Sequence, residues 1–282
     1  MRDDHSIEQD WAGYSETEHA TWRALFARQK ALLPGRAADA FLNGLTRLPI
    51  FGEGIPDFDA LNEVLFKTTQ WRLVAVPGLV PDEVFFDHLA NRRFPAARFI
   101  RRPEQMDYLE EPDIFHDVFG HAPMLMLPAF ADYMQAYGKG GLRALRLGVL
   151  ERLARVYWYT VEFGLVQEQA GLRIYGSGIV SSRSESMFCL EDPSPHRLAF
   201  DLRRVLRTRY RIDDFQECYF VIRGFDQLLE LAEIDFAPIY RSVETLPDIA
   251  PGDLSADDRV ITRGTGAYHA AKRAGTIIDT RR

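Results

Sequence analysis

One carboxylate constrains the fold of this 282-residue chain more than any other side chain. Glu162 lies in residues 156–166 (VYWYTVEFGLV), a run so apolar that both faces of a helix there must be largely buried. A carboxylate that is buried without a partner costs several kcal/mol. Glu162 must therefore form an ion pair with an arginine or help to bind a metal ion.

Two histidines could complete a metal site with Glu162, although their spacing does not place them on one face of an α-helix. His116 and His121 are five residues apart, and on an ideal α-helix their rings would point about 140° away from each other. We expect a helix from Pro112 to Gly120, with Gly120 as a left-handed cap that lets His121 turn back toward His116. Pro123 should then prevent the helix from resuming at once.

The residue types leave the metal and the class of protein open. Two imidazoles and a carboxylate bind iron in non-haem Fe(II) oxygenases and zinc in some hydrolases. The zinc peptidase signature, with a glutamate between two histidines four residues apart, does not occur in this segment, which modestly favours iron. A zinc hydrolase using Glu185 or Asp117 as its base is one alternative. A non-catalytic helical binding protein, with Glu162 paired to a buried arginine, is another.

Helical periodicity dominates the chain, so we predict a mainly α fold with small β elements. The pattern predicts helices at residues 16–33, 37–48, 57–66, 81–91, 112–119, 142–169, 197–209 and 226–233. Short strands are predicted at residues 71–76, 97–100, 172–175 and 215–222. No repeat or linker divides residues 1–246, which we expect to form a single catalytic domain. Residues 247–282 are polar and weakly periodic, and we expect a loosely packed tail.

Composition excludes several kinds of partner. The net charge of −7 argues against a nucleic acid, and no apolar stretch approaches the roughly 20 residues of a membrane span. The N-terminus is polar and lacks the apolar core of a secretory signal, so we expect a cytoplasmic protein with no membrane contact. Cys189 and Cys218 lie in apolar surroundings, where free thiols behave as small hydrophobic groups.

Four motifs then resemble one enzyme family in its own order along the chain. They are residues 98–101 (RFIR), 111–121 (EPDIFHDVFGH), 157–164 (YWYTVEFG) and 175–182 (YGSGIVSS). Together they resemble the pterin-dependent aromatic amino acid hydroxylases, and among these the bacterial phenylalanine 4-hydroxylases, over residues 11–236. The resemblance implies the catalytic-domain fold of that family.

The resemblance also implies roles for individual residues. His116, His121 and Glu162 correspond to the three iron ligands, and Arg101 to the arginine that binds the substrate carboxylate, a role suited to a planar fork. Leu109 stands where the animal enzymes have threonine, so only a backbone contact is implied there. Further residues correspond to the substrate pocket (Pro112, Trp158, Ser181, Ser182), to the pterin loop (Gly78, Leu79, Val80, Phe85) and to polar positions near the iron (Tyr157, Glu185).

The implied reaction is the hydroxylation of L-phenylalanine to L-tyrosine with O2 and a tetrahydropterin, either tetrahydrobiopterin or a related pterin, at Fe(II). Hydroxylation of tryptophan by the same fold is an alternative. The chain has no room for the regulatory domain of the animal enzymes and lacks the heptads of their tetramerisation helix. We therefore expect an unregulated monomer.

Overall fold

The computed structural model describes residues 3–50, 52–107, 109 and 111–276, most of which form helices. The α-helices are α1 (Glu16–Leu32), α2 (Asp39–Arg47), α3 (Phe58–Thr69), α4 (Asp82–Ala90), α5 (Ala122–Leu125), α6 (Pro128–Leu147), α7 (Leu150–Tyr157), α8 (Ser177–Val180), α9 (Arg183–Glu191), α10 (Leu202–Arg207), α11 (Asp226–Glu233), α12 (Phe236–Val243) and α13 (Ala267–Arg273). Two π-helices, η3 (Phe115–His121) and η4 (Trp158–Glu162), lie within the motifs at residues 111–121 and 157–164. Two 3-10 turns, η1 (Trp11–Gly13) and η2 (Pro103–Gln105), complete the helical elements.

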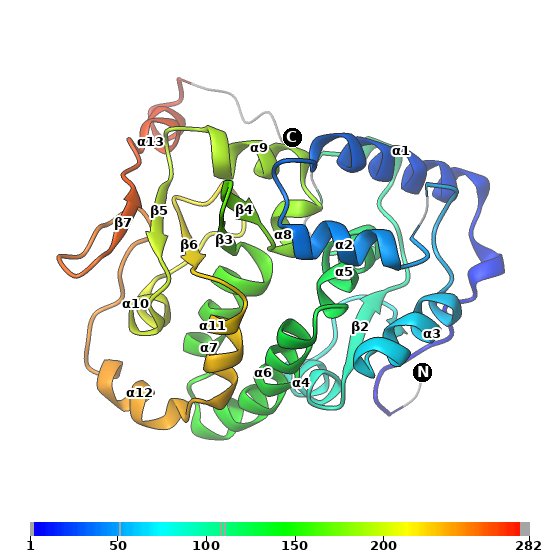
Figure 1. Cartoon of the computed structure of the whole chain (residues 1–282), viewed down its shortest axis with the longest axis horizontal. Helices are drawn as coiled ribbons and strands as arrows, with labels where there is room; N and C mark the ends of the chain where they lie inside the picture. Colours follow the sequence, from blue (N-terminus) through cyan, green and yellow to red (C-terminus); the bar gives the residue numbers. More distant parts are fainter. Residues whose placement is uncertain (1–2, 51, 108, 110, 277–282) are drawn as a thin grey trace.

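The strands form two small sheets on opposite sides of the helices (Figure 1). One is a parallel pair of β1 (Arg72–Val76) and β2 (Arg93–Ala97). The other has five strands in the order β4-β3-β6-β5-β7, which are β3 (Leu165–Glu168), β4 (Gly171–Ile174), β5 (His196–Ala199), β6 (Cys218–Ile222) and β7 (Val260–Thr262). The prediction of a mainly α fold with small β elements is confirmed.

Local sequence explains where several helices begin and which face they bury. Ser15 and Glu18 form a capping box at the start of α1, and Asp57 caps α3 as predicted. From α1, Trp22 and Leu25 enter the core with no exposed surface. The long helix α6 runs along the lower part of the molecule in Figure 1 and packs against α4 and α11.

The boundaries of three predicted elements were wrong. The helix predicted at residues 142–169 is divided by Gly148, whose φ of 68° ends α6, and its last part is the strand β3. Short apolar runs suit a buried strand as well as a helix, which explains the error. The helix predicted at 197–209 is β5 followed by α10, and the strand predicted at 97–100 is β2, ending at Ala97.

Residues 247–276, where we expected a loosely packed tail, contact the rest of the domain at several points, and most of them stay at least partly exposed. Strand β7 pairs with β5, and Ile249 bridges to Thr208. Asp258 forms an ion pair of 2.8 Å with Arg204, and both side chains are buried. A few well-placed polar anchors thus hold a segment whose composition alone suggested disorder. Residues 277–282 lie outside the described residues.

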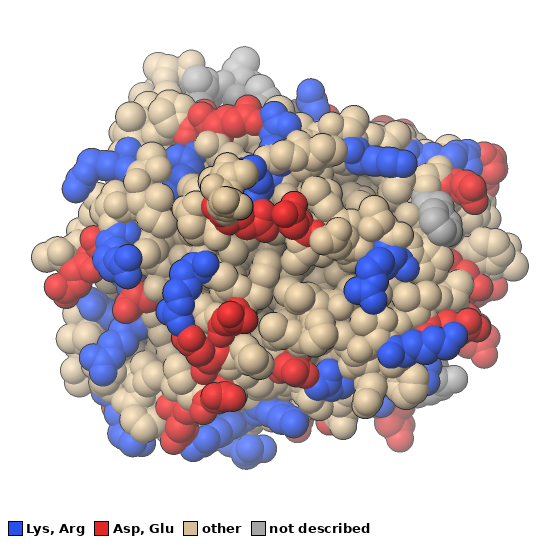
Figure 2. Space-filling view, in the orientation of Figure 1, with Lys and Arg blue, Asp and Glu red and all other residues tan. Residues whose placement is uncertain are grey.

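The surface in Figure 2 carries interspersed basic and acidic side chains. None of the helices in the described part of the chain combines the length and apolar character needed to cross a bilayer.

Candidate metal centre and its two pockets

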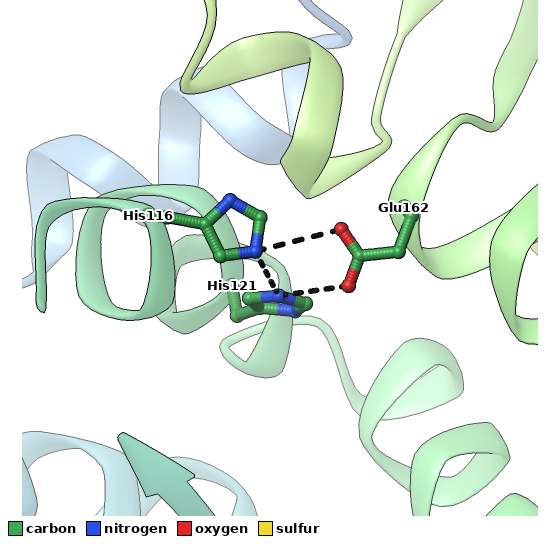
Figure 3. A group of neighbouring side chains, drawn as sticks. All are labelled: His116, His121 and Glu162. Atoms are coloured by element: carbon green, nitrogen blue, oxygen red, sulfur yellow. Dashed lines mark hydrogen bonds and ion pairs between the residues drawn. The ribbon is translucent and has the colours of Figure 1, made fainter. Parts of the chain in front are cut away.

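The structure brings His116, His121 and Glu162 together at one point (Figure 3). Their ligand atoms all lie within 4.8 Å of one another. Glu162 Oε2 is 3.5 Å from His116 Nε2, Glu162 Oε1 is 3.3 Å from His121 Nε2, and the two Nε2 atoms are 3.3 Å apart. The histidines come from η3 and the glutamate from the last residue of η4.

The two histidines meet because η3 is a π-helix. A π-turn joins residues five apart by a hydrogen bond, so residues at that spacing lie on the same side. The same turn is seen in η4, where Phe163 N donates to Trp158 O over 2.8 Å. The prediction that Gly120 ends a helix in the left-handed conformation was wrong: Gly120 lies inside η3 and is not among the glycines with positive φ.

Gly120 is required by packing instead of by conformation. A Cβ atom at this position would lie 3.0 Å from the carbonyl oxygen of Ser177 and 3.1 Å from its Cβ. The absence of a side chain therefore lets α8 lie directly against η3. The interruption expected at Pro123 was also wrong, because η3 continues directly into α5 and Pro123 lies within this helical run.

Hydrogen bonds around His116 direct its lone pair to the metal centre. The hydroxyl of Ser181 donates to Ser177 O over 2.7 Å, so it accepts from His116 Nδ1, which is 3.0 Å away. The proton is thus assigned to Nδ1, and Nε2 faces His121 and Glu162 unprotonated. The hydroxyl of Ser177 donates to Glu162 Oε2 over 2.8 Å. Two facing imidazole nitrogens and a carboxylate form a donor set that fits a divalent cation.

The titration behaviour of the site agrees with metal binding. Burial lowers the pKa of His116 to about 4, so the ring is neutral near pH 7. Burial raises the pKa of Glu162, but the two imidazoles and Ser177 outweigh it and bring this pKa down to about 2. A neutral imidazole and an ionised carboxylate are the forms that bind metals. The partners of Glu162 are these groups, so the alternative in which it pairs with a buried arginine is wrong.

One pocket beside the metal centre has a volume of about 410 Å³, within the range of small-molecule sites. We call it the amino acid pocket, after the substrate that the sequence resemblance implies. All six residues predicted for the substrate line it. They are Arg101, Leu109, Pro112, Trp158, Ser181 and Ser182.

Arg101 is held in this pocket by a carboxylate that the sequence analysis missed. Asp113 has no exposed surface and accepts hydrogen bonds from Arg101 Nε at 2.8 Å, Nη2 at 2.9 Å and the backbone N at 2.9 Å. It also accepts from His116 N at 3.0 Å. Asp113 thus ties the pocket arginine to the segment that carries a metal ligand. The only signal in the sequence was its place three residues before His116.

Trp158 forms a rigid wall of the amino acid pocket. Its ring stacks on Phe163, with centroids 4.6 Å apart, and on Tyr210, with centroids 4.4 Å apart. Its indole N–H donates to Gln216 Oε1 over 2.9 Å. Gln216, which also lines the pocket, was missed because nothing in its local sequence separates it from an ordinary polar residue before a strand.

A second, smaller pocket of about 240 Å³, which we call the loop pocket, contains all four residues predicted for the pterin. Gly78, Leu79 and Val80 follow β1, and Leu79 N donates to Glu111 Oε1 over 3.1 Å. Phe85 comes from α4, and its ring meets that of Tyr157 edge-on at 5.8 Å. The two pockets share four lining residues, which are Pro112, His116, Tyr157 and Glu162.

The two residues predicted near the iron have different surroundings. Tyr157 lies parallel to His121, with ring centroids 6.4 Å apart, and lines both pockets. Glu185 is buried beside the amino acid pocket, where it accepts hydrogen bonds from the Tyr219 hydroxyl and from Gln216 N.

Several known proteins are similar to this chain over most of its length. Residues 6–241 match the family model described as biopterin-dependent aromatic amino acid hydroxylase. The chain is 60% identical over 265 residues to a phenylalanine-4-hydroxylase of Ralstonia nicotianae, covering 94% of this chain and 85% of the relative. It is also 60% identical over 270 residues to that of Caulobacter vibrioides, covering 96% and 92%.

Solved structures agree with these relatives. The iron- and phenylalanine-bound crystal structure of phenylalanine hydroxylase from Chromobacterium violaceum superposes with a TM-score of 0.89 at 53% identity, covering 93% of this chain and 95% of that one. The cobalt-bound structure of the same enzyme gives a TM-score of 0.91 at 54% identity, covering 93% and 94%. The chain therefore belongs to the biopterin-dependent aromatic amino acid hydroxylases and has their catalytic-domain fold.

Proposed function

We propose that this protein is a phenylalanine 4-monooxygenase, which converts L-phenylalanine to L-tyrosine with O2 and a tetrahydropterin at Fe(II). The observation that carries the proposal is the position of the metal centre beside two pockets. His116 and Glu162 line both pockets, and His121 lines the loop pocket. One pocket holds an arginine fork and an indole, which suit an aromatic amino acid. The other is a backbone loop faced by a phenyl ring, which suits a flat heterocycle.

The three donors fit iron, since two imidazoles and one carboxylate leave positions open for O2. When bound, iron and the pterin would together supply the activated oxygen that reaches the aromatic ring. The chain provides the donors in the required protonation state. Ser181 keeps the proton of His116 on Nδ1, and Ser177 holds Glu162 in place.

The amino acid pocket would orient the substrate from both ends. Arg101 uses Nε and Nη2 for Asp113, which fixes the plane of its guanidinium group for a substrate carboxylate. Trp158, held between two rings and by Gln216, would fix the substrate ring beside the metal centre. Holding both ends limits the ring to one approach, which favours attack at a single carbon.

The loop pocket would bind the pterin through main-chain groups of residues 78–80 and through the ring of Phe85. Phe85 is held edge-on to Tyr157, so its position is fixed relative to His121. The pterin in the loop pocket and the amino acid in the other pocket would then both lie beside His116 and Glu162, which line both pockets.

Product analysis tests the proposal directly. The Fe(II)-loaded protein should form tyrosine from phenylalanine only when both O2 and tetrahydropterin are present. Omission of each reactant, replacement of iron by zinc, and competition between phenylalanine and tryptophan separate the alternatives. Activity with zinc and without O2 would indicate a hydrolase. Preferred turnover of tryptophan would identify tryptophan, and not phenylalanine, as the substrate. Absence of tyrosine under all conditions would refute the proposal.

Arg101→Lys tests the carboxylate site while keeping a positive charge beside Asp113. Because an ammonium group cannot provide a planar fork, the KM for phenylalanine should rise about tenfold, and the KM for the pterin should stay the same. Arg102→Lys is the matched control, since the neighbouring Arg102 is exposed. Equal KM values for the two variants would exclude Arg101 from substrate binding.

We also propose that the protein acts as a monomer. Light scattering coupled to size-exclusion chromatography should give a mass near 32.3 kDa, and a mass twice as large would refute this.

A further inference from the structure

The C-terminal helix α13 lies against the segment of residues 211–216, which we call the pocket loop. This helix follows the stretch 6–241 that matches the family model. It also belongs to the region whose composition suggested a loose tail. Its contacts with the pocket loop are specific and involve three of its seven residues.

Two of these contacts reach the same buried carboxylate. The hydroxyl of Tyr268 donates to Asp214 Oδ1 over 3.1 Å, and Lys272 Nζ lies 2.9 Å from Asp214 Oδ2. The Asp214 side chain is 1% exposed, whereas that of Lys272 is 26% exposed. The third contact is from His269 Nε2 to the carbonyl oxygen of Phe215 at 2.8 Å. Since a carbonyl only accepts, the imidazole donates here.

An aromatic cluster also joins α13 to the pocket loop. The rings of Phe188 and Phe215 are stacked at 4.3 Å. Tyr268 meets them edge-on at 5.3 Å and 5.2 Å, respectively. Edge-on and stacked pairs of this kind stabilise beyond the area that they bury. The contacts of α13 are therefore with α9 and the pocket loop together.

The pocket loop in turn shapes the amino acid pocket. Ile212, Asp214 and Gln216 all line it. Gln216 is 2% exposed, and its Nε2 donates to Arg211 O over 2.9 Å while its Oε1 accepts from the Trp158 indole. Its backbone N donates to Glu185 Oε1 over 3.3 Å. Displacement of the pocket loop would therefore move the group that fixes the plane of Trp158.

We propose that α13 is a positioning element of the amino acid pocket, acting through Tyr268, His269 and Lys272 on the pocket loop and through Gln216 on Trp158. This inference rests on the proposed function, because it assigns the amino acid to the pocket that Trp158 lines. None of the three α13 residues lines that pocket, so their effect on the substrate is indirect. The loop pocket is lined by none of residues 211–216 and should be unaffected.

The test uses the full-length, iron-loaded double variant Tyr268→Phe/Lys272→Met, which removes both contacts with Asp214. The KM for phenylalanine should rise about fivefold, and the KM for the pterin should change less than twofold. Amide hydrogen exchange should become faster in residues 211–216 and stay unchanged in β1. The single variant Lys272→Arg, which keeps the charge beside Asp214, should retain the wild-type KM. Lys67→Met is the matched control, because Lys67 is a 77% exposed lysine on α3.

Hydrogen exchange does not depend on turnover, so it separates the two proposals. If the wild type forms no tyrosine, the proposed function fails, and exchange in residues 211–216 still decides whether α13 holds the pocket loop. Unchanged exchange there, or an unchanged KM for phenylalanine in an active variant, would overturn the inference. A parallel rise of both KM values with faster exchange in β1 would show a general loss of structure and would also overturn it. Tyr268→Phe alone is a milder change, so it should raise the KM for phenylalanine and the exchange rate in residues 211–216 by smaller amounts.

Discussion

Asp113→Asn is the substitution with the most definite expected effect, because it keeps the shape of a fully buried side chain and removes its charge. Asp113 Oδ2 accepts from Arg101 N and Nε, and Oδ1 accepts from Arg101 Nη2 and His116 N. Asparagine has one acceptor oxygen and one NH2 group. Whichever way the amide is turned, its NH2 group faces two N–H donors that lose their acceptor.

The magnitude follows from these contacts. A buried donor without an acceptor costs about 1–3 kcal/mol, and removing one partner of a buried ion pair costs about 3–5 kcal/mol. The two descriptions overlap, so we expect the free energy of unfolding to fall by about 3–5 kcal/mol. Since domains of this kind are stable by about 5–15 kcal/mol, the variant should remain folded. The freed guanidinium group should also raise the KM for phenylalanine at least about tenfold.

Urea unfolding of the metal-free protein measures the first effect, and steady-state kinetics of the iron-loaded enzyme measure the second. Asp107→Asn is a matched control for stability, because Asp107 pairs with Arg28 at 2.7 Å but its side chain is 64% exposed. Such a pair contributes at most about 1 kcal/mol. A loss below 1 kcal/mol in Asp113→Asn, or an unchanged KM, would refute the role given to Asp113.

Three further predictions concern the metal site and acid stability. Glu162→Gln should lower the affinity for Fe(II) at least about 100-fold in a metal titration, and unchanged iron content would remove Glu162 from the ligands. Burial lowers the pKa of His88, whose Nε2 lies 2.8 Å from Asp4 O and whose buried Nδ1 has no hydrogen-bond partner among the described residues. On acidification, His88 therefore binds a proton in the unfolded chain at a higher pH than in the folded protein. The free energy of unfolding should fall as the pH drops below about 6.5. His88→Gln should lose less stability between pH 7 and pH 5.5 in urea titrations, and an equal loss would exclude His88 as the cause. Gly120→Ala should cost about 1–3 kcal/mol of stability and weaken iron binding, because the new methyl group displaces Ser177. Unchanged iron affinity would show that α8 can yield.

Local sequence was enough for the helices with caps and for the choice of metal ligands. The caps of α1 and α3 depend on residues within three positions, and the cost of burying Glu162 follows from its neighbours. The meeting of the histidines was predicted, but the mechanism was wrong. A π-turn differs from an α-turn by one residue per hydrogen bond, and Gly120 in this turn packs closely against Ser177, 57 residues later in the sequence. Sequence patterns do not show such contacts.

The partners of the pocket side chains were missed for the same reason. Asp113 meets Arg101 across twelve residues, and Gln216 meets Trp158 across 58. In the tail, Asp258 and His269 look like surface residues in the sequence, but the structure gives both of them buried partners. Composition describes an average, whereas a few paired polar groups decide whether such a segment packs.

The π-helical form of η3 and η4 affects any attempt to transplant this metal site. Each π-turn holds one residue more than an α-turn. A regular helix of the same sequence would rotate His121 away from His116, so a designed scaffold of straight helices would separate the ligands. Shortening the histidine spacing from five to four would suit such a scaffold, because residues four apart lie on one face of an α-helix. A designer must therefore copy the irregular turns or change the ligand spacing, and grafting the three side chains alone would fail.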